Sequence, residues 1–157
     1  MSKITPFLWF DGQAEAAANF YVSVFEGSKL LNVSLYGDGA PMPKGTVMAA
    51  SFLLAGQEFI ALNGGPQFTF SPAISFVVNC ETQNDIDHYW EKLADGGEQL
   101  QCGWLTDRYG VSWQVVPTIL GNLLSDSDVA RSQRIMTAML QMRKLDIEAL
   151  KQAHRGD

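Results

Sequence analysis

The chain has few of the residues that most often build metal and redox centres: its 157 residues include two histidines and two cysteines. Cys80 and Cys102 are too few for a disulfide framework, and their spacing does not match a zinc site. A catalytic thiol requires a histidine or a cation beside it, and the linear sequence does not show one. We therefore interpret both cysteines as reduced thiols of a cytoplasmic protein.

Basic residues are also scarce. The chain has 11 Lys and Arg against 17 Asp and Glu, a formal net charge of −6. Because nucleic-acid binding relies on clustered Lys and Arg at phosphates, we expect no nucleic-acid partner. No apolar run is long enough to span a bilayer, and the start MSKITPFLWFDG lacks the pattern of a signal peptide, so we expect no membrane association.

The first half of the chain reads as a strand, a helix and three further strands. Residues 4–10 are an apolar run of strand length, and residues 14–24 carry an apolar stripe at helical spacing. Residues 29–36 form the next expected strand. The runs at 46–54 and 57–63 predict a hairpin that turns at Ala55-Gly56.

The second half repeats this order. Residues 73–80 resemble a strand, residues 83–94 a helix, and the stretch 98–119 a strand pair around Arg108-Tyr109-Gly110. The shared order predicts an α+β fold of two duplicated βαβββ modules, residues 1–70 and 71–122, within one domain that spans residues 1–157.

Residues 123–157 have no counterpart in the first half. Methionines and aliphatic residues at helical spacing predict a helix that ends near Met142, and a shorter helix follows with Asp146 as its N-cap. The apolar side of this extension either packs within the subunit or contacts a partner subunit, and the sequence leaves both open.

Several motifs resemble one protein family. They are LNGGP at 62–66, AISFVVNC at 73–80, Gly96-Gly97, CGWLTDRYGVSWQVVP at 102–117 and MTAMLQMRKLDIEAL at 136–150. Together they resemble the PhnB-like branch of the vicinal oxygen chelate superfamily, which includes glyoxalase I, extradiol dioxygenases and the bleomycin and fosfomycin resistance proteins. The resemblance implies two modules whose sheets curl around a cleft, usually in a homodimer.

In the metal enzymes of that superfamily, four strands each direct one His, Glu or Gln into the cleft, and a divalent ion bound there acts as a Lewis acid. At the corresponding positions this chain has Pro6, Asn63, Ser75 and Gln114. Amides and a hydroxyl are poor ligands for transition metals. The resemblance therefore implies a site with no cofactor and no metal ligands, with a divalent metal held by substituted ligands as the alternative.

Strand alternation places Ser112 and Gln114 on one face and Trp113 on the other, where we expect it in the core. Gln114 either bonds neighbouring backbone or orients a ligand. Asn63 either ends a strand in a turn or lies at the rim of the pocket. Trp9 and Trp104 either line the cleft or fill the core. The candidate ligand-binding residues are thus Asn63, Ser75, Gln114, Trp9 and Trp104.

The favoured function is a cytoplasmic, homodimeric protein that binds a small molecule in its cleft. The alternatives are a metal-dependent lyase, isomerase or dioxygenase of the same superfamily, and a resistance protein that binds a cationic or aromatic drug. Members of the branch are often labelled 3-demethylubiquinone-9 3-methyltransferase. The sequence has no G-x-G turn between a strand and a helix, so it gives no support to methyl transfer from S-adenosylmethionine.

Overall fold

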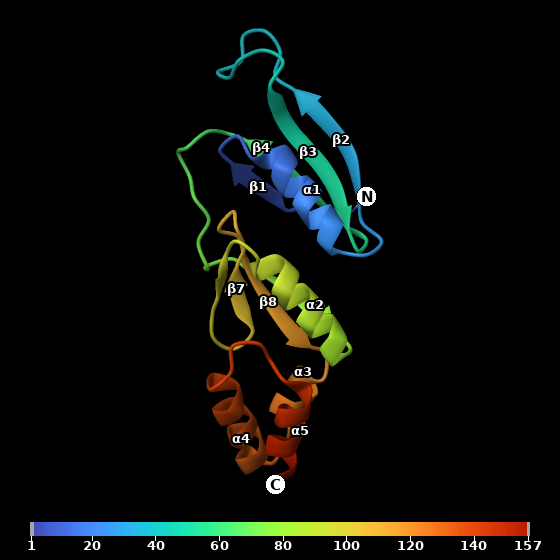
Figure 1. The fold of residues 1–157 in the computed structure, drawn as a ribbon, viewed down its shortest axis with the longest axis vertical. Coiled ribbons are helices and arrows are strands. Elements are labelled where there is room, and N and C mark those ends of the chain that lie inside the picture. Colours follow the sequence, from blue (N-terminus) through green and yellow to red (C-terminus); the bar gives the residue numbers. More distant parts are fainter. Residues whose placement is uncertain (1, 157) are drawn as a thin grey trace. The chain divides into compact units, whose positions relative to one another are not determined.

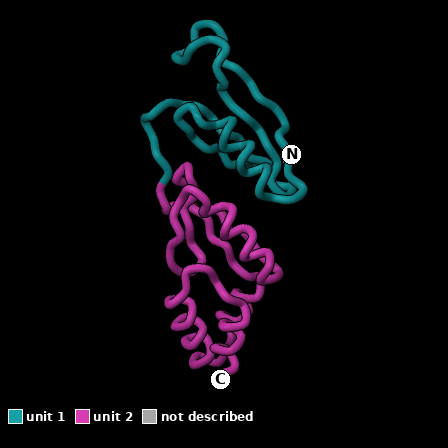
Figure 2. The backbone as a smooth tube through the Cα atoms, in the orientation of Figure 1, with its two compact units in different colours: residues 1–70 teal, residues 71–157 magenta. Residues whose placement is uncertain are grey.

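The computed structural model describes residues 2–156 and divides at residue 70 into two compact units (Figure 2). No helix in the part of the chain that the structure describes has the length and apolar character of a membrane span.

Unit 1 contains β1 (Phe7–Phe10), α1 (Ala14–Val24), β2 (Lys29–Leu35), β3 (Val47–Leu54) and β4 (Gln57–Asn63). Its sheet has the order β1-β4-β3-β2, with β1 parallel to β4 and the other pairs antiparallel (Figure 1). The expected turn lies between β3 and β4, where Ala55 and Gly56 both have positive φ. Two consecutive left-handed residues match the twist of a two-residue hairpin.

The core of unit 1 lies between α1 and one face of this sheet. Tyr21 of α1 is fully buried and stacks on Phe52 of β3, and Phe52 stacks in turn on Phe59 of β4. Small residues of α1, among them Ala14, Ala17 and Ala18, are also fully buried. Their size allows the helix to approach the strands closely, and the alternate strand residues face away from it.

Unit 2 repeats the arrangement with β5 (Phe76–Cys80), α2 (Gln83–Ala94), β6 (Glu98–Gln99), β7 (Trp104–Thr106) and β8 (Ser112–Pro117). The sheet order is β5-β8-β7-β6, and β5 is parallel to β8. Both units therefore have the connectivity βαβββ with a mixed four-stranded sheet. The predicted α+β fold of two such modules is confirmed.

One expected strand is interrupted. The stretch 98–107 forms two short strands, β6 and β7, because Cys102 and Gly103 between them both have positive φ, at 60° and 82°. An extended strand cannot pass through two left-handed residues. The sequence pattern did not indicate this turn, since Cys102 is not a residue that commonly adopts the left-handed conformation.

The C-terminal extension belongs to unit 2 and forms α3 (Leu120–Leu124), α4 (Val129–Leu140) and α5 (Ile147–Arg155). Asp146 caps α5 by accepting a hydrogen bond from the Ala149 N–H, as predicted. The three helices share a buried cluster with the end of β8, formed by Leu120, Ile135, Leu145 and Leu150 with Val116 packed against them. Part of the apolar side thus packs within the subunit, whereas Val129, Met136 and Leu140 remain exposed.

Candidate functional site

The face of the second sheet that points away from its buried core carries three of the five predicted site residues. Leu105 and Trp113 are buried among the core residues. Strand alternation therefore turns their neighbours Trp104 and Gln114 to the opposite face. Trp104 of β7 lies directly opposite Gln114 of β8 in the register of the sheet. The Gln114 Nε2 atom donates a 2.9 Å hydrogen bond to Ser75 Oγ, just before β5.

Three polar atoms on this face have no partner among residues 2–156. The Nε2 atom of the Gln114 amide bonds Ser75, as described above. No described residue donates a hydrogen bond to the other amide atom, Oε1. The indole N–H of Trp104 is likewise without a described acceptor. Ser112, two residues before Gln114, is 1% exposed, and its Oγ atom has no hydrogen-bond partner. Trp104 and Gln114 are part-exposed, so their two atoms are open to solvent or to a ligand, whereas the Ser112 hydroxyl is buried. We name Trp104, Gln114, Ser75 and Ser112 the polar face of unit 2.

The charge of this face is low. The four strands of the sheet contain no Lys or Arg, and Glu98 carries their one carboxylate. In the strand register, Glu98 of β6 lies opposite Thr106 of β7, and Thr106 lies opposite Ser112 of β8. An anionic ligand would find no countercharge on these strands. The face is instead suited to a neutral or cationic molecule that can stack on an indole and exchange hydrogen bonds with an amide and a hydroxyl.

Trp9 lies on the equivalent, core-opposed face of unit 1, but its polar atom is satisfied. The Trp9 indole donates a 2.9 Å hydrogen bond to the Gly65 carbonyl, and Phe68 packs edge-on against the ring. A β-carbon added to Gly64 would lie 2.4 Å from the Trp9 ring, so the loop after β4 needs glycine there to cover the indole. Trp9 thus offers a ring surface but no free hydrogen-bond donor.

Asn63 is engaged by the backbone of its own unit. Its Oδ1 atom accepts a 2.9 Å hydrogen bond from the Ala14 N–H at the start of α1, and its Nδ2 atom donates to the Val47 carbonyl at 3.1 Å. The residue at the helix start, Gln13, makes no side-chain cap. Asn63 therefore caps α1 from the end of a distant strand, a role that the local sequence could not reveal.

Replacing Asn63 tests this capping role. We expect Asn63→Ala to lower the free energy of unfolding by about 1–2 kcal/mol, because the first turn of α1 and the Val47 carbonyl both lose a partner. Asn63→Asp keeps the acceptor and should cost less. Denaturant midpoints measure both variants, and a midpoint unchanged in Asn63→Ala would contradict the capping role.

The remaining chemistry-bearing residues lie outside the polar face of unit 2. Cys80 is buried in β5, and burial, with Asp85 nearby, raises the pKa of its thiol to about 11. The thiol is therefore protonated at neutral pH and a poor nucleophile. His88 is exposed on α2 and packs edge-on against Tyr89. His154 in α5 contacts Asp126 at 2.8 Å.

The DRYG stretch is a structural turn. Asp107 is 3% exposed, and its Oδ1 atom accepts hydrogen bonds from the N–H groups of Tyr109 and Val111. Its Oδ2 atom accepts a 2.8 Å bond from the Trp113 indole. Gly110 has φ of 89°. Asp107 and Gly110 thus form the turn of the strand pair, and Trp113 lies in the core, as expected.

The positions that bear metal ligands in the superfamily's enzymes do not fit a transition metal here. Pro6 has no donor atom, both ends of the Asn63 amide bond backbone, and Ser75 and Gln114 bond each other. Within residues 2–156 no three His, Cys, Asp or Glu side chains gather in a group that could hold a metal ion. The donors present are neutral oxygens and nitrogens, which transition metals bind weakly.

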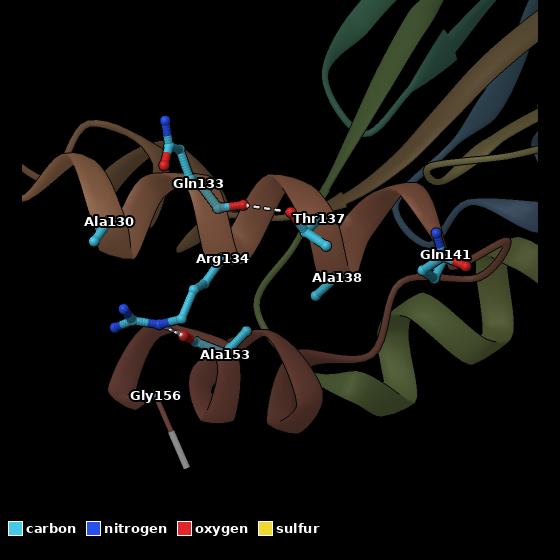
Figure 3. Close-up of a pocket in the computed structure, with 8 residues that line it drawn as sticks. All are labelled: Ala130, Gln133, Arg134, Thr137, Ala138, Gln141, Ala153 and Gly156. Atoms are coloured by element: carbon cyan, nitrogen blue, oxygen red, sulfur yellow. Dashed lines mark hydrogen bonds between the residues drawn. The ribbon is translucent and has the colours of Figure 1, made fainter.

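A separate open groove of about 630 Å³ lies between α4 and α5 (Figure 3). Arg134 points into it and donates from Nε to the Ala153 carbonyl and from a terminal nitrogen to the His154 carbonyl. These bonds cap the C-terminal end of α5, where carbonyls lack helical partners. The guanidinium therefore has a structural role, and none of the predicted site residues lines this groove.

Comparison with known proteins places the chain among solved structures. The family described as 3-demethylubiquinone-9 3-methyltransferase matches residues 2–116. A PhnB protein from Bacillus cereus is 43% identical, with a TM-score of 0.68 over 74% of this chain and 100% of that chain. Protein PA1353 from Pseudomonas aeruginosa is 23% identical, with a TM-score of 0.62 over 74% of this chain and 98% of that one.

More distant structures share the fold. The fosfomycin resistance protein FosX from Listeria monocytogenes is 13% identical, with a TM-score of 0.51 over 74% of this chain and 93% of that one. No curated protein matches. The family match ends at residue 116, before α3, so the C-terminal extension lies outside it.

Proposed function

Because this chain belongs to the family described as 3-demethylubiquinone-9 3-methyltransferase, a PhnB-like branch of the vicinal oxygen chelate superfamily, we propose that it binds a small molecule on the polar face of unit 2. We propose that binding uses no catalytic metal. The observation that carries the proposal is a pair of part-exposed polar atoms on one sheet face, the Trp104 indole N–H and Gln114 Oε1, that no described residue satisfies.

Each residue has a distinct part in this proposal. Trp104 supplies an aromatic surface and one donor, Gln114 supplies an acceptor, and Ser75 fixes the Gln114 amide so that Oε1 stays free. Trp9 and Asn63 lie in unit 1, outside the site proposed here: the Trp9 indole bonds the Gly65 carbonyl, and the Asn63 amide caps α1.

The ligand proposed is neutral or cationic and partly aromatic. Glu98 and the absence of Lys and Arg from the strands of this sheet support that choice. This observation also favours the second candidate, a protein that binds a cationic aromatic drug. Methyl transfer is not proposed, because the turn between β1 and α1 carries one glycine, Gly12, and that between β5 and α2 carries none.

A binding experiment with variants tests the proposal. The neutral aromatic dye N-phenyl-1-naphthylamine reports binding through its fluorescence. We expect Gln114→Ala to raise its Kd about fivefold to thirtyfold, the loss of a hydrogen bond of about 1–2 kcal/mol. Ser112→Ala should leave stability unchanged or raise it slightly, because it removes a buried hydroxyl that no described residue satisfies.

The outcome separates the candidates. Saturable binding that Gln114→Ala weakens supports the proposal, and an unchanged Kd removes Gln114 from the site. A preference for a cationic aromatic compound over the neutral dye selects the drug-binding function. About one equivalent of bound metal, with a higher Tm on adding manganese, nickel, iron or zinc, would instead select the metal-dependent enzyme.

Assembly and location remain proposals from the family resemblance. A homodimer in the cytoplasm is the arrangement we propose, and the exposed side of α4 with Val129, Met136 and Leu140 is available for a subunit contact. Light scattering on the purified protein measures the mass of the assembly directly. A monomer at micromolar concentration would contradict the homodimer.

A further inference from the structure

The turn before Trp104 is strained and needs support. Cys102 and Gly103 immediately precede Trp104, and both have left-handed backbone conformations. Cys102 is one of two non-glycine residues with positive φ among residues 2–156, and the other, Ala55, lies in a hairpin turn. Such a conformation persists only when surrounding contacts hold it. The position of the Trp104 side chain therefore depends on what holds this turn.

The connector between α4 and α5, residues 141–146, supplies that support. The Cys102 N–H donates to the Met142 carbonyl at 2.9 Å, and the Gly103 N–H donates to the Arg143 carbonyl at 2.8 Å. Leu145, fully buried, packs over the turn: a β-carbon added to Gly103 would lie 3.0 Å from its Cδ1 atom. The C-terminal extension thus binds the strained turn through backbone hydrogen bonds and a buried side chain.

The connector is in turn fixed by the first residue of α2. Gln83 donates from Nε2 to the Leu145 carbonyl at 3.0 Å and accepts the Ile147 N–H on Oε1 at 2.8 Å. Lys144 adds a 2.8 Å ion pair with Asp87, one turn along α2. The hydrogen bonds from Lys144 and Gln83 hold the pKa of Asp87 below its ordinary value. The Gln83 side chain therefore makes hydrogen bonds to the backbone on both sides of Asp146, at Leu145 and at Ile147.

We propose that Gln83 and the connector form a clamp by which the C-terminal extension sets the position of Trp104 and so controls ligand affinity at the polar face of unit 2. The ligand part of this inference rests on the proposed function. Gln83 is a positioning residue, because it acts on Trp104 through the connector and the turn. The family match ends at residue 116, so the clamp joins an element outside the matched region to the binding face.

The experiment uses the full-length, ¹⁵N-labelled protein and the variant Gln83→Ala. We expect the amide hydrogens of Cys102 and Gly103 to exchange about tenfold faster, and the Trp104 indole N–H signal to shift. Trp104→Phe identifies that signal among the four tryptophans. The Kd for N-phenyl-1-naphthylamine should rise about threefold to tenfold, as expected when the support of a binding residue loosens.

Two further variants make the test specific. Gln83→Glu keeps an acceptor for the Ile147 N–H but loses the donor to the Leu145 carbonyl and faces Asp87, so it should also loosen the turn. Gln152→Ala is the matched control, since Gln152 is exposed on α5 and its side chain makes no hydrogen bond or ion pair with a described residue. It should leave exchange, indole signal and Kd unchanged.

The two proposals fail in different ways. If the wild-type protein does not bind the dye, the proposed function fails for this ligand class, and the amide exchange and the indole signal still decide the clamp. If Gln83→Ala leaves both of these signals unchanged, the clamp is overturned. If the turn loosens but the Kd stays the same in a protein that binds the dye, control of affinity by the clamp is overturned.

Discussion

Asp107→Ala should lower the free energy of unfolding by about 3 kcal/mol, because one buried carboxylate satisfies three donors. Its Oδ1 atom accepts from the Tyr109 and Val111 N–H groups, and its Oδ2 atom accepts from the Trp113 indole. Removing it takes this acceptor away from the indole N–H of Trp113, a residue that is 3% exposed. Denaturant unfolding followed by tryptophan fluorescence and by circular dichroism measures the loss.

Two controls distinguish the stability lost with these hydrogen bonds from a general effect of removing a carboxylate. Asp95→Ala removes an exposed partner of Arg108 and should cost less than about 0.5 kcal/mol. Combining Asp107→Ala with Trp113→Phe should cost less than the sum of the single changes, because the indole donor is then absent. Strict additivity would show that the bond between the Asp107 carboxylate and the Trp113 indole contributes nothing to stability.

Gly97→Ala should have a comparably large effect, at least about 3 kcal/mol, because there is no space for a methyl group. A β-carbon at Gly97 would lie 2.1 Å from the Thr106 carbonyl oxygen and 2.7 Å from the Asp107 carbonyl carbon. These are backbone atoms that cannot turn away as the end of a side chain can. Relief would require the strand that leads into the Asp107 turn to move.

The matched control for this substitution is Gly121→Ala. Gly121 lies in α3, and a β-carbon there would meet no atom within 4 Å. Alanine should therefore raise stability by about 0.5–1 kcal/mol through its higher helix propensity. Thermal unfolding of the two variants side by side gives the contrast. A Gly97→Ala variant as stable as the wild type would contradict the close approach between Gly97, in the turn after α2, and the backbone of Thr106 and Asp107.

The polar face of unit 2 could be predicted in part. Strand alternation placed Gln114 and Ser112 on one side and Trp113 on the other, and the structure has this arrangement. The bond between Gln114 and Ser75 could not be foreseen, because the two residues are 39 positions apart and meet only through the parallel pairing of β5 and β8. Nor does alternation alone show that the Ser112 hydroxyl is buried and unpaired.

Asn63 shows a different limit of sequence reasoning. Its place at the end of β4 was expected, yet its amide reaches the start of α1, 49 residues earlier in the chain. A helix cap is normally sought in the residue just before the helix, which here is Gln13 and makes no cap. The capping partner became visible only when the register of β1 against β4 brought Phe10 and Asn63 side by side.

By itself the sequence determined the local elements, because apolar periodicity depends on residues a few positions apart. It determined the two βαβββ modules and two of the three helices of the extension, the second with Asp146 as its cap. The tertiary structure alone decided which polar groups are paired. Asn63 bonds the start of α1, Gln83 bonds the connector, and the Ser112 hydroxyl has no partner among the described residues. Hydrogen bonds between distant segments depend on tertiary packing, and no local sequence pattern records that packing.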